Sequence, residues 1–166
     1  MPEVTLYWLA SCYLIPLGRI ANSFPRLEAS RSQRILWLLE VLNAPYKIEI
    51  FHRDPKTKLA PPELKKIHAL GKSPVISIQP EGHAEPIVIA ESGLITEYLC
   101  EHYGKGSGLV PQHWQPGKEH QIGGETAEWM RHKYYMHYGE SSLMPFMILA
   151  LVAGKIKNSP VPFFIR

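Results

Sequence analysis

The order of the apolar runs in the first hundred residues limits most strongly how this chain can fold. Residues 4–9 (VTLYWL) are a short run of strand-forming side chains, and residues 30–42 repeat apolar side chains at helical spacing before a stop at Pro45. Residues 46–51 (YKIEIF) alternate polar and apolar side chains, which is typical of a half-buried strand. The first part of the chain is therefore predicted to form a strand, a helix and a second strand.

The next fifty residues predict a short helix, a hairpin and a longer helix. Residues 60–71 (APPELKKIHALG) begin with prolines and end at a glycine, which is the composition of a short helix with its stop signal. The apolar runs 75–78 and 87–90 flank a turn composition, so we expect an antiparallel hairpin, and residues 94–102 return to a helical pattern. This order, with Pro74 before the third strand, outlines the α/β thioredoxin-like fold.

The composition changes after Gly104. Residues 105–121 contain glycine and proline without periodicity, so they predict a linker between a first domain at 1–104 and a second at 122–166. The second part supports one or two helices with aromatic and aliphatic side chains, and it ends in an apolar tail at 163–165.

Composition excludes several classes of function. The 166 residues carry a net charge of +3 from scattered side chains, without the basic stripe of a nucleic-acid-binding protein. Cys12 and Cys100 stand far apart with no metal-type spacing, which indicates neither a disulfide framework nor a zinc site and fits a reducing compartment. The uncharged run 4–18 is too short to span a membrane and follows an acidic residue, so we expect neither a signal peptide nor a membrane span.

Three ordered blocks of sequence carry a resemblance to a known family. SRSQRILWLLE, APPELKKIHALGKSPV and IAESGLITEYL, in this order, resemble the fungal glutathione transferases of the yeast type. The resemblance implies a thioredoxin-like domain followed by an all-α C-terminal domain, here truncated. It also implies a homodimeric, cytoplasmic or endoplasmic-reticulum-associated enzyme that uses glutathione as co-substrate and needs no metal. Its expected activity is conjugation of glutathione to a hydrophobic electrophile, with glutathione peroxidase activity as a further one.

The chemistry of such an enzyme assigns roles at the start of the first helix. A transferase must lower the pKa of the glutathione thiol, because the thiolate is the nucleophile, and a hydroxyl at a helix N-terminus can do so. By the resemblance, Ser30 matches the serine that stabilises the thiolate, with Arg31 beside it and Ser32 as a substitute. The alternative is that Ser30 only caps the helix in a capping box with Gln33. Tyr7 is a further candidate donor, for which core packing is the alternative role.

Two later motifs supply the remaining contacts to glutathione. In the thioredoxin-like fold the Ser73-Pro74 bond is expected to be cis, and Val75 is expected to pair with the cysteinyl part of glutathione as an added strand. Ser92 and the neighbouring helix amides are expected to bind the γ-glutamyl carboxylate, while Glu91 pairs with the γ-glutamyl ammonium group. Read alone, Glu91 and Ser92 would be a helix cap.

Two departures from the family leave alternatives open. Residues 10–27 are an eighteen-residue insert between the first strand and the first helix, and our hypothesis is a retained or mispredicted intron, which a mature transcript containing these codons would disprove. The helical domain is also shortened, so the electrophile pocket is expected to be incomplete and the chain poorly soluble. The alternatives to a working transferase are therefore a non-catalytic glutathione-binding or interaction module and an inactive product of a faulty gene model.

Overall fold

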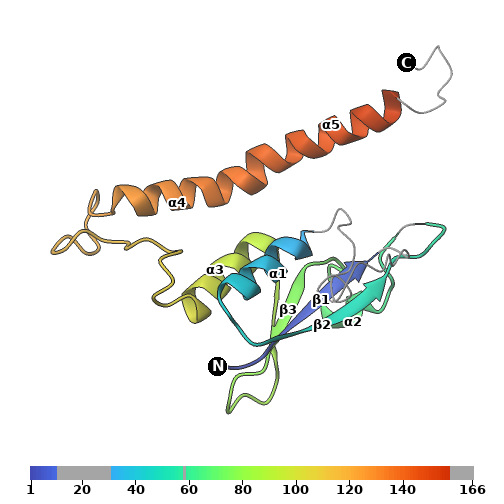
Figure 1. Ribbon diagram of the computed structural model, residues 1–166, viewed down its shortest axis with the longest axis horizontal. Helices are drawn as coiled ribbons and strands as arrows, with labels where there is room; N and C mark the ends of the chain where they lie inside the picture. The colour runs from blue at the N-terminus through green and yellow to red at the C-terminus, as the bar shows by residue number, and fades with distance from the viewer. Residues whose placement is uncertain (11–30, 58, 158–166) are drawn as a thin grey trace. The chain divides into compact units, whose positions relative to one another are not determined.

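The computed structural model describes residues 1–10, 31–57 and 59–157 and divides into two compact units, Met1–Leu109 and Val110–Arg166. Most of the proposed insert 10–27 and the whole apolar tail 163–165 lie outside the described residues. The first unit contains four strands and three helices in the predicted order (Figure 1), namely β1 Val4–Ala10, α1 Ser32–Val41, β2 Tyr46–His52, α2 Leu64–Ile67, β3 Val75–Ile78, β4 Ile87–Ala90 and α3 Ser92–Tyr103.

The four strands form one mixed sheet in the order β2-β1-β3-β4. Strand β1 pairs in parallel with β2, while β3 pairs antiparallel with both β1 and β4. The parallel pair needs a crossover connection, which contains α1, whereas the antiparallel pair β3–β4 is joined directly as a hairpin. This topology confirms the predicted thioredoxin-like fold.

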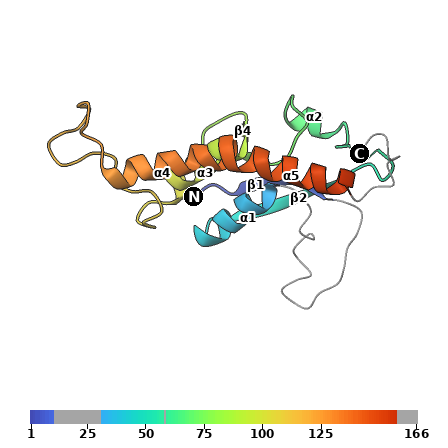
Figure 2. The ribbon, with the colours of Figure 1, turned by 90° about the horizontal axis from the view of Figure 1, so that it is seen from above.

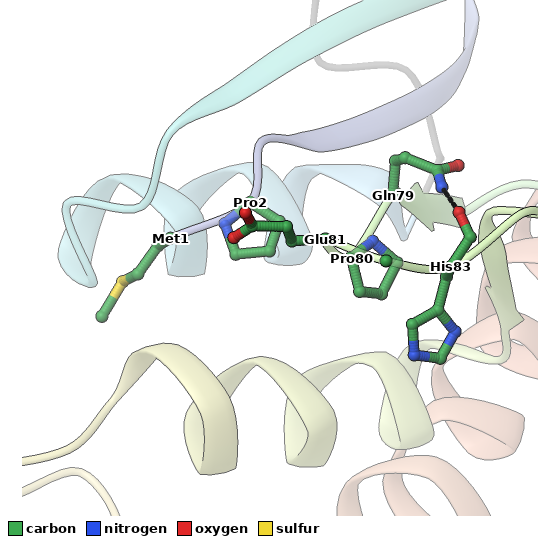
Figure 3. Close-up of a pocket in the computed structure, with 7 residues that line it drawn as sticks. Met1, Pro2, Gln79, Pro80, Glu81 and His83 are labelled. Atoms are coloured by element: carbon green, nitrogen blue, oxygen red, sulfur yellow. Dashed lines mark hydrogen bonds between the residues drawn. The ribbon is translucent and has the colours of Figure 1, made fainter.

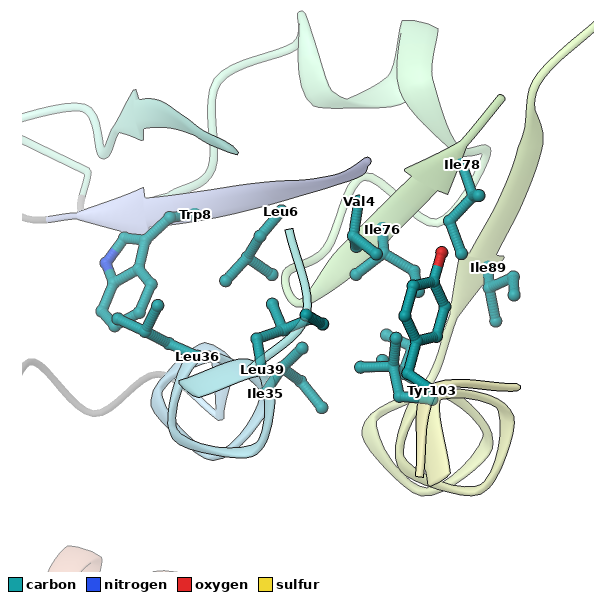
Figure 4. Packing of buried hydrophobic residues seen from close by; sticks show 13 residues of the cluster. Val4, Leu6, Trp8, Ile35, Leu36, Leu39, Ile76, Ile78, Ile89 and Tyr103 are labelled. Atoms are coloured by element: carbon teal, nitrogen blue, oxygen red, sulfur yellow. The ribbon is translucent and has the colours of Figure 1, made fainter. Parts of the chain in front are cut away.

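The core lies between one face of the sheet and the helices α1 and α3. Because successive side chains of a strand point to opposite faces, Val4, Leu6 and Trp8 of β1 all enter this core, whereas Tyr7 lies on the other face. Figure 4 shows the strand side chains directed at α1 and α3, and Figure 2 shows α2 on the side of β1 and β2 away from α1. The helices and remaining strands contribute Ile35, Leu36, Leu39, Ile76, Ile78, Ile89, Ile95, Leu99 and Tyr103.

Element boundaries differ from the predicted ones at two helices. Helix α2 ends at Ile67, and His68 is already extended, so the prediction that Gly71 ends this helix is wrong. Gly71 instead has φ +56° in a following turn, where its N–H donates to the carbonyl of His68 at 2.8 Å. Helix α3 begins at Ser92, two residues before the predicted start, because the chain turns sharply at Glu91.

The described part of the second unit, up to residue 157, consists of a folded loop and one long helix. Trp114 and Glu125 form an isolated bridge in the loop, and the ring of His113 stacks between those of Trp114 and Trp129 at centroid distances of 4.0 and 3.7 Å. The helix runs through α4 Ala127–Tyr138, a π-helical turn η2 Gly139–Leu143 and α5 Met144–Lys157. No residue of α4, η2 or α5 is buried.

This helix is long and apolar enough, over Ala127–Lys157, to cross a membrane by length and composition. The sequence predicts no membrane span from residues 4–18, which this helix does not include. The uncharged part of the helix is 141–154, fourteen residues, whereas a spanning helix needs about 20. A segment of this length is more typical of a helix that packs against other apolar surfaces.

Candidate functional site

Three of the sequence-predicted motifs meet at one end of the sheet. Tyr7 of β1 stands opposite Val75 of β3, and Val75 stands opposite Ala90 of β4, so these three residues form one row across the sheet. The residues just beyond this row are Pro74 and Glu91. The peptide bond between Ser73 and Pro74 is cis, as predicted.

Helix α1 joins the same end of the sheet through a pair of hydroxyl groups. Ser32, the first residue of α1, is fully buried, and its Oγ lies 2.6 Å from Oγ of Ser73. Ser73 also donates a hydrogen bond to the backbone carbonyl of Tyr7, at 2.9 Å. The N-terminus of α1, the segment before β3 and the middle of β1 are therefore connected by side-chain hydrogen bonds.

Helix α3 begins at this end as well. Glu91 occupies the cap position with φ +72°, a region that residues other than glycine rarely adopt. Its side chain is exposed. Ser92 is buried at 4% exposure, and its carbonyl accepts a hydrogen bond from the Thr96 hydroxyl at 2.8 Å. The first intrahelical backbone bond runs from the N–H of Ile95 to the carbonyl of Glu91. The first turn of α3, before Ile95, thus lies at this end of the sheet.

The two helix N-termini give this end of the sheet a positive electrostatic character. Each helix carries roughly half a positive charge at its N-terminus, which favours anions nearby. Helix α1 begins at Ser32, which contacts Ser73 beside the row described above, and α3 begins at Ser92, just after β4 ends in that row at Ala90. This arrangement can hold a thiolate or a carboxylate, and the exposed carboxylate of Glu91 can pair with a cation.

The predicted strand addition at Val75 does not fit the sheet. Val75 is 1% exposed and pairs on one side with Tyr7 and on the other with Ala90, so neither of its backbone edges is open to a ligand. Ser73 is half-buried and belongs to no strand pair among the described residues. Backbone pairing with a ligand is therefore possible before Pro74 rather than after it.

The structure places the remaining candidate side chains in different environments. Ser30 lies outside the described residues, so neither its role toward the thiol nor its capping box is tested. Arg31 is the half-buried cap residue of α1, and its side chain makes no cap hydrogen bond. The Tyr7 hydroxyl lies 3.0 Å from Oγ of Ser77, which places it along β3 and fits the packing role. Burial raises the pKa of the Cys100 thiol, which lies on α3.

A surface depression of about 560 Å³ lies at the opposite end of the sheet (Figure 3). Its lining comes from the N-terminus and the β3–β4 turn, namely Met1, Pro2, Gln79, Pro80, Glu81, Gly82 and His83. The nearby row of the sheet pairs Val4 with Ile78, three residues along β3 from Val75. No predicted site residue lines this depression. Within the described ranges there is also no group of three or more His, Cys, Asp or Glu placed to hold a metal ion.

The sheet order, the packing of α1 and α3 on one face and the cis-proline segment define the first unit as a thioredoxin-like domain. Residues 30–102 match the family described as Glutathione S-transferase, N-terminal domain. The chain is 36% identical over 137 residues to Glutathione S-transferase 1 of Saccharomyces cerevisiae and 33% identical over 138 residues to Glutathione S-transferase 3 of Schizosaccharomyces pombe. Residues 30–102 are therefore a glutathione S-transferase N-terminal domain, and the chain is similar to glutathione S-transferases of two yeasts.

Solved structures agree with this assignment. A glutathione S-transferase from Actinobacillus pleuropneumoniae is 28% identical and superposes with a TM-score of 0.62, over 97% of this chain and 57% of that one. A glutathione transferase homolog from Lodderomyces elongisporus, solved with two glutathione molecules per subunit, shares the fold at a TM-score of 0.60 and 18% identity, over 98% and 62% of the two chains.

The matches cover 82% and 83% of this chain but only 53% and 49% of the yeast and fission-yeast proteins. The chain thus spans about half the length of the curated relatives it matches.

Proposed function

We propose that this protein is a glutathione transferase, which binds reduced glutathione at the end of the sheet that holds Ser73 and Glu91 and conjugates it to electrophilic substrates. The observation that supports this most directly is the meeting of two helix N-termini with the cis-proline segment in a domain of the matching family. Glutathione carries a thiol and a γ-glutamyl zwitterion, so its binding site must offer groups of both signs.

The proposed chemistry depends on the pKa of the glutathione thiol. A thiol with a pKa of about 8.5 is only a few per cent ionised at pH 7, whereas a thiol with a pKa of about 6.5 is roughly three-quarters ionised. The N-terminus of α1 and the Ser30 hydroxyl, with Arg31 beside it, are proposed to supply this shift. The helix dipole and a hydroxyl donor both favour the charged form of the sulfur.

The γ-glutamyl end of glutathione is proposed to bind at α3. Its carboxylate accepts hydrogen bonds from the first amides of α3 and from Ser92, and its ammonium group pairs with the exposed carboxylate of Glu91. The backbone of Ser73, which lies outside the strand pairs, is proposed to hold the cysteinyl part in place of Val75.

Several properties of the whole enzyme belong to the same proposal. They are a hydrophobic electrophile as second substrate, glutathione peroxidase activity as an additional reaction, a homodimer, and a cytoplasmic or endoplasmic-reticulum-associated location. Their support is the family alone, because the chain spans about half of its curated relatives.

A test of the proposal uses the full chain, its Ser30→Ala variant and a Ser107→Ala control in the exposed loop after α3. We expect all three to bind immobilised glutathione. Ser30→Ala should lose about tenfold or more of its conjugation rate at pH 7 and regain rate as the pH rises toward about 8.5, because the unassisted thiol then ionises by itself. Binding without Ser30-dependent turnover would instead support the non-catalytic module, and no binding would support the inactive product.

A variant that lacks residues 10–27 separates the effect of the insert from that of the site. It joins β1 directly to the sequence before α1, as in the family. If the full chain binds glutathione without turnover and the shortened variant gains turnover, the insert displaces the catalytic serine, since even a 1 Å displacement costs a large factor in rate. Equal rates in the two chains would contradict this effect of the insert.

A further inference from the structure

The hydroxyl groups of Ser32 and Ser73 form a directed chain that ends on the backbone of β1. Oγ of Ser32 lies 2.6 Å from Oγ of Ser73, and Oγ of Ser73 lies 2.9 Å from the carbonyl oxygen of Tyr7. Forty-one positions separate the two serines, and sixty-six separate Ser73 from Tyr7. These hydrogen bonds therefore connect elements that are distant in sequence.

The direction of these hydrogen bonds follows from counting protons. A serine hydroxyl has one proton to donate and two lone pairs that accept, whereas a carbonyl oxygen only accepts. The proton of Ser73 is therefore used in its bond to Tyr7. Ser73 can only accept in its contact with Ser32, so Ser32 is the donor of the 2.6 Å bond.

We propose that Ser32 is a positioning residue, which holds the Ser73–Pro74 segment against the N-terminus of α1, and that it does not donate to the glutathione sulfur. This inference deepens the proposed function and, for its effect on glutathione, rests on it. The Ser32 side chain is fully buried, and its only hydroxyl proton points to Ser73. Ser32 therefore cannot replace Ser30 as the donor to a thiolate without breaking the bond that locates Ser73.

The positioning role follows from what the chain of hydroxyls connects. Ser73 precedes the strand row at Val75 and lies outside the strand pairs, so the pairing of β3 with β1 and β4 does not hold it directly. Its two side-chain bonds hold it instead, one to β1 and one to α1. Removal of Ser32 should loosen Ser73 relative to α1, while the bond to Tyr7 survives.

The first test needs no glutathione and compares urea unfolding of the full chain with Ser32→Ala, Ser73→Ala and the double variant. Ser73→Ala removes both hydrogen bonds, to Ser32 and to Tyr7, whereas Ser32→Ala leaves Ser73 bonded to Tyr7. We expect Ser73→Ala to lower the urea midpoint more than Ser32→Ala does. Adding Ser32→Ala to Ser73→Ala should then lower the midpoint little or raise it. If the two losses in urea midpoint simply add in the double variant, the proposed direction of the hydrogen bond from Ser32 to Ser73 is wrong.

The second test measures glutathione kinetics at several pH values in the full chain. Ser32→Ala is expected to raise the KM for glutathione about two- to tenfold, the factor that one ordinary hydrogen bond supplies, with the pKa of the bound thiol unchanged. Ser77→Ala is the matched control, because it removes a buried hydroxyl of β3 that takes no part in the Ser32–Ser73–Tyr7 hydrogen bonds. A raised thiol pKa in Ser32→Ala would overturn the proposal and make Ser32 a donor. If the unmodified chain binds no glutathione, the proposed function fails, and the urea comparison still decides the role of Ser32 in the hydroxyl chain.

Discussion

At the scale of single residues, Glu91 combines an unfavourable backbone conformation with a place in the proposed site. Its φ of +72° and ψ of 119° lie where a side chain is strained, at a cost of about 1–3 kcal/mol. Strain of this kind is retained where the surrounding structure fixes the residue, which here stands between the last residue of β4 and the first of α3.

The expected consequence is that Glu91→Gly separates stability from binding. Glycine adopts φ +72° without strain, so the free energy of unfolding should stay level or rise by about 1 kcal/mol, while glutathione affinity falls with the loss of the carboxylate. Urea unfolding and glutathione titration measure the two effects. Glu101→Gly, at an exposed position within α3, should lower the free energy of unfolding by about 1 kcal/mol. A similar loss in Glu91→Gly would show that the residue is not strained.

Residue-scale features of the site were predictable only in part from the sequence. The cis bond before Pro74 was expected from the thioredoxin-like fold, and Glu91 and Ser92 were expected to stand beside a helix start, although α3 begins two residues earlier than predicted. The contact of Ser32 with Ser73 joins residues forty-one positions apart, and no local pattern encodes it. The positive φ of Glu91 is equally hidden, because a glutamate there carries no turn signal.

At the scale of elements, the sequence predicted the type and order of each strand and helix in the first unit, because each rests on its own periodicity. The sequence-based predictions failed where contacts between elements decide the outcome. Val75 was expected to offer an open backbone edge, but strand order is a property of the whole sheet, and β3 lies inside it. Helix α2 likewise ends at Ile67 because His68 is extended, and Gly71 belongs to the turn that follows.

The end of α3 offers a test of close packing within one element. A Cβ atom at Gly104 would lie 2.4 Å from the carbonyl oxygen of Cys100, so Gly104→Ala forces the last turn of α3 to move. We expect a loss of about 1–3 kcal/mol in the free energy of unfolding, measured with urea. Gly93→Ala is the matched control, because nothing lies within 4 Å of its Cβ position, and it should be neutral or stabilising by up to about 1 kcal/mol. Equal effects of the two substitutions would contradict this account.

At the scale of the whole molecule, the two units differ in how much apolar surface they bury. The first unit has a continuous core between its sheet and two helices. The helix of the second unit leaves large apolar side chains in solvent, among them Phe146, Leu149 and Leu151, each more than 60% exposed. Exposed apolar surface on this scale drives association with other surfaces.

We therefore expect residues 1–109 to remain monomeric in solution and residues 1–166 to self-associate at the same concentration. Size-exclusion chromatography with light scattering gives the mass of each species, and circular dichroism shows whether both remain folded. A variant with Phe146, Leu149 and Leu151 all changed to serine controls for chain length, and it should move the full chain toward the monomer. A monomeric full chain with intact helix content would contradict the expectation.

The position of β2 at the edge of the sheet sets how the domain can meet its neighbours. An edge strand can extend a sheet into a second molecule, and proteins oppose this with charged side chains. Lys47 and Glu49 are exposed along β2, so a strand added there would have to desolvate both charges. Assemblies of this protein should accordingly avoid pairing a further strand with β2.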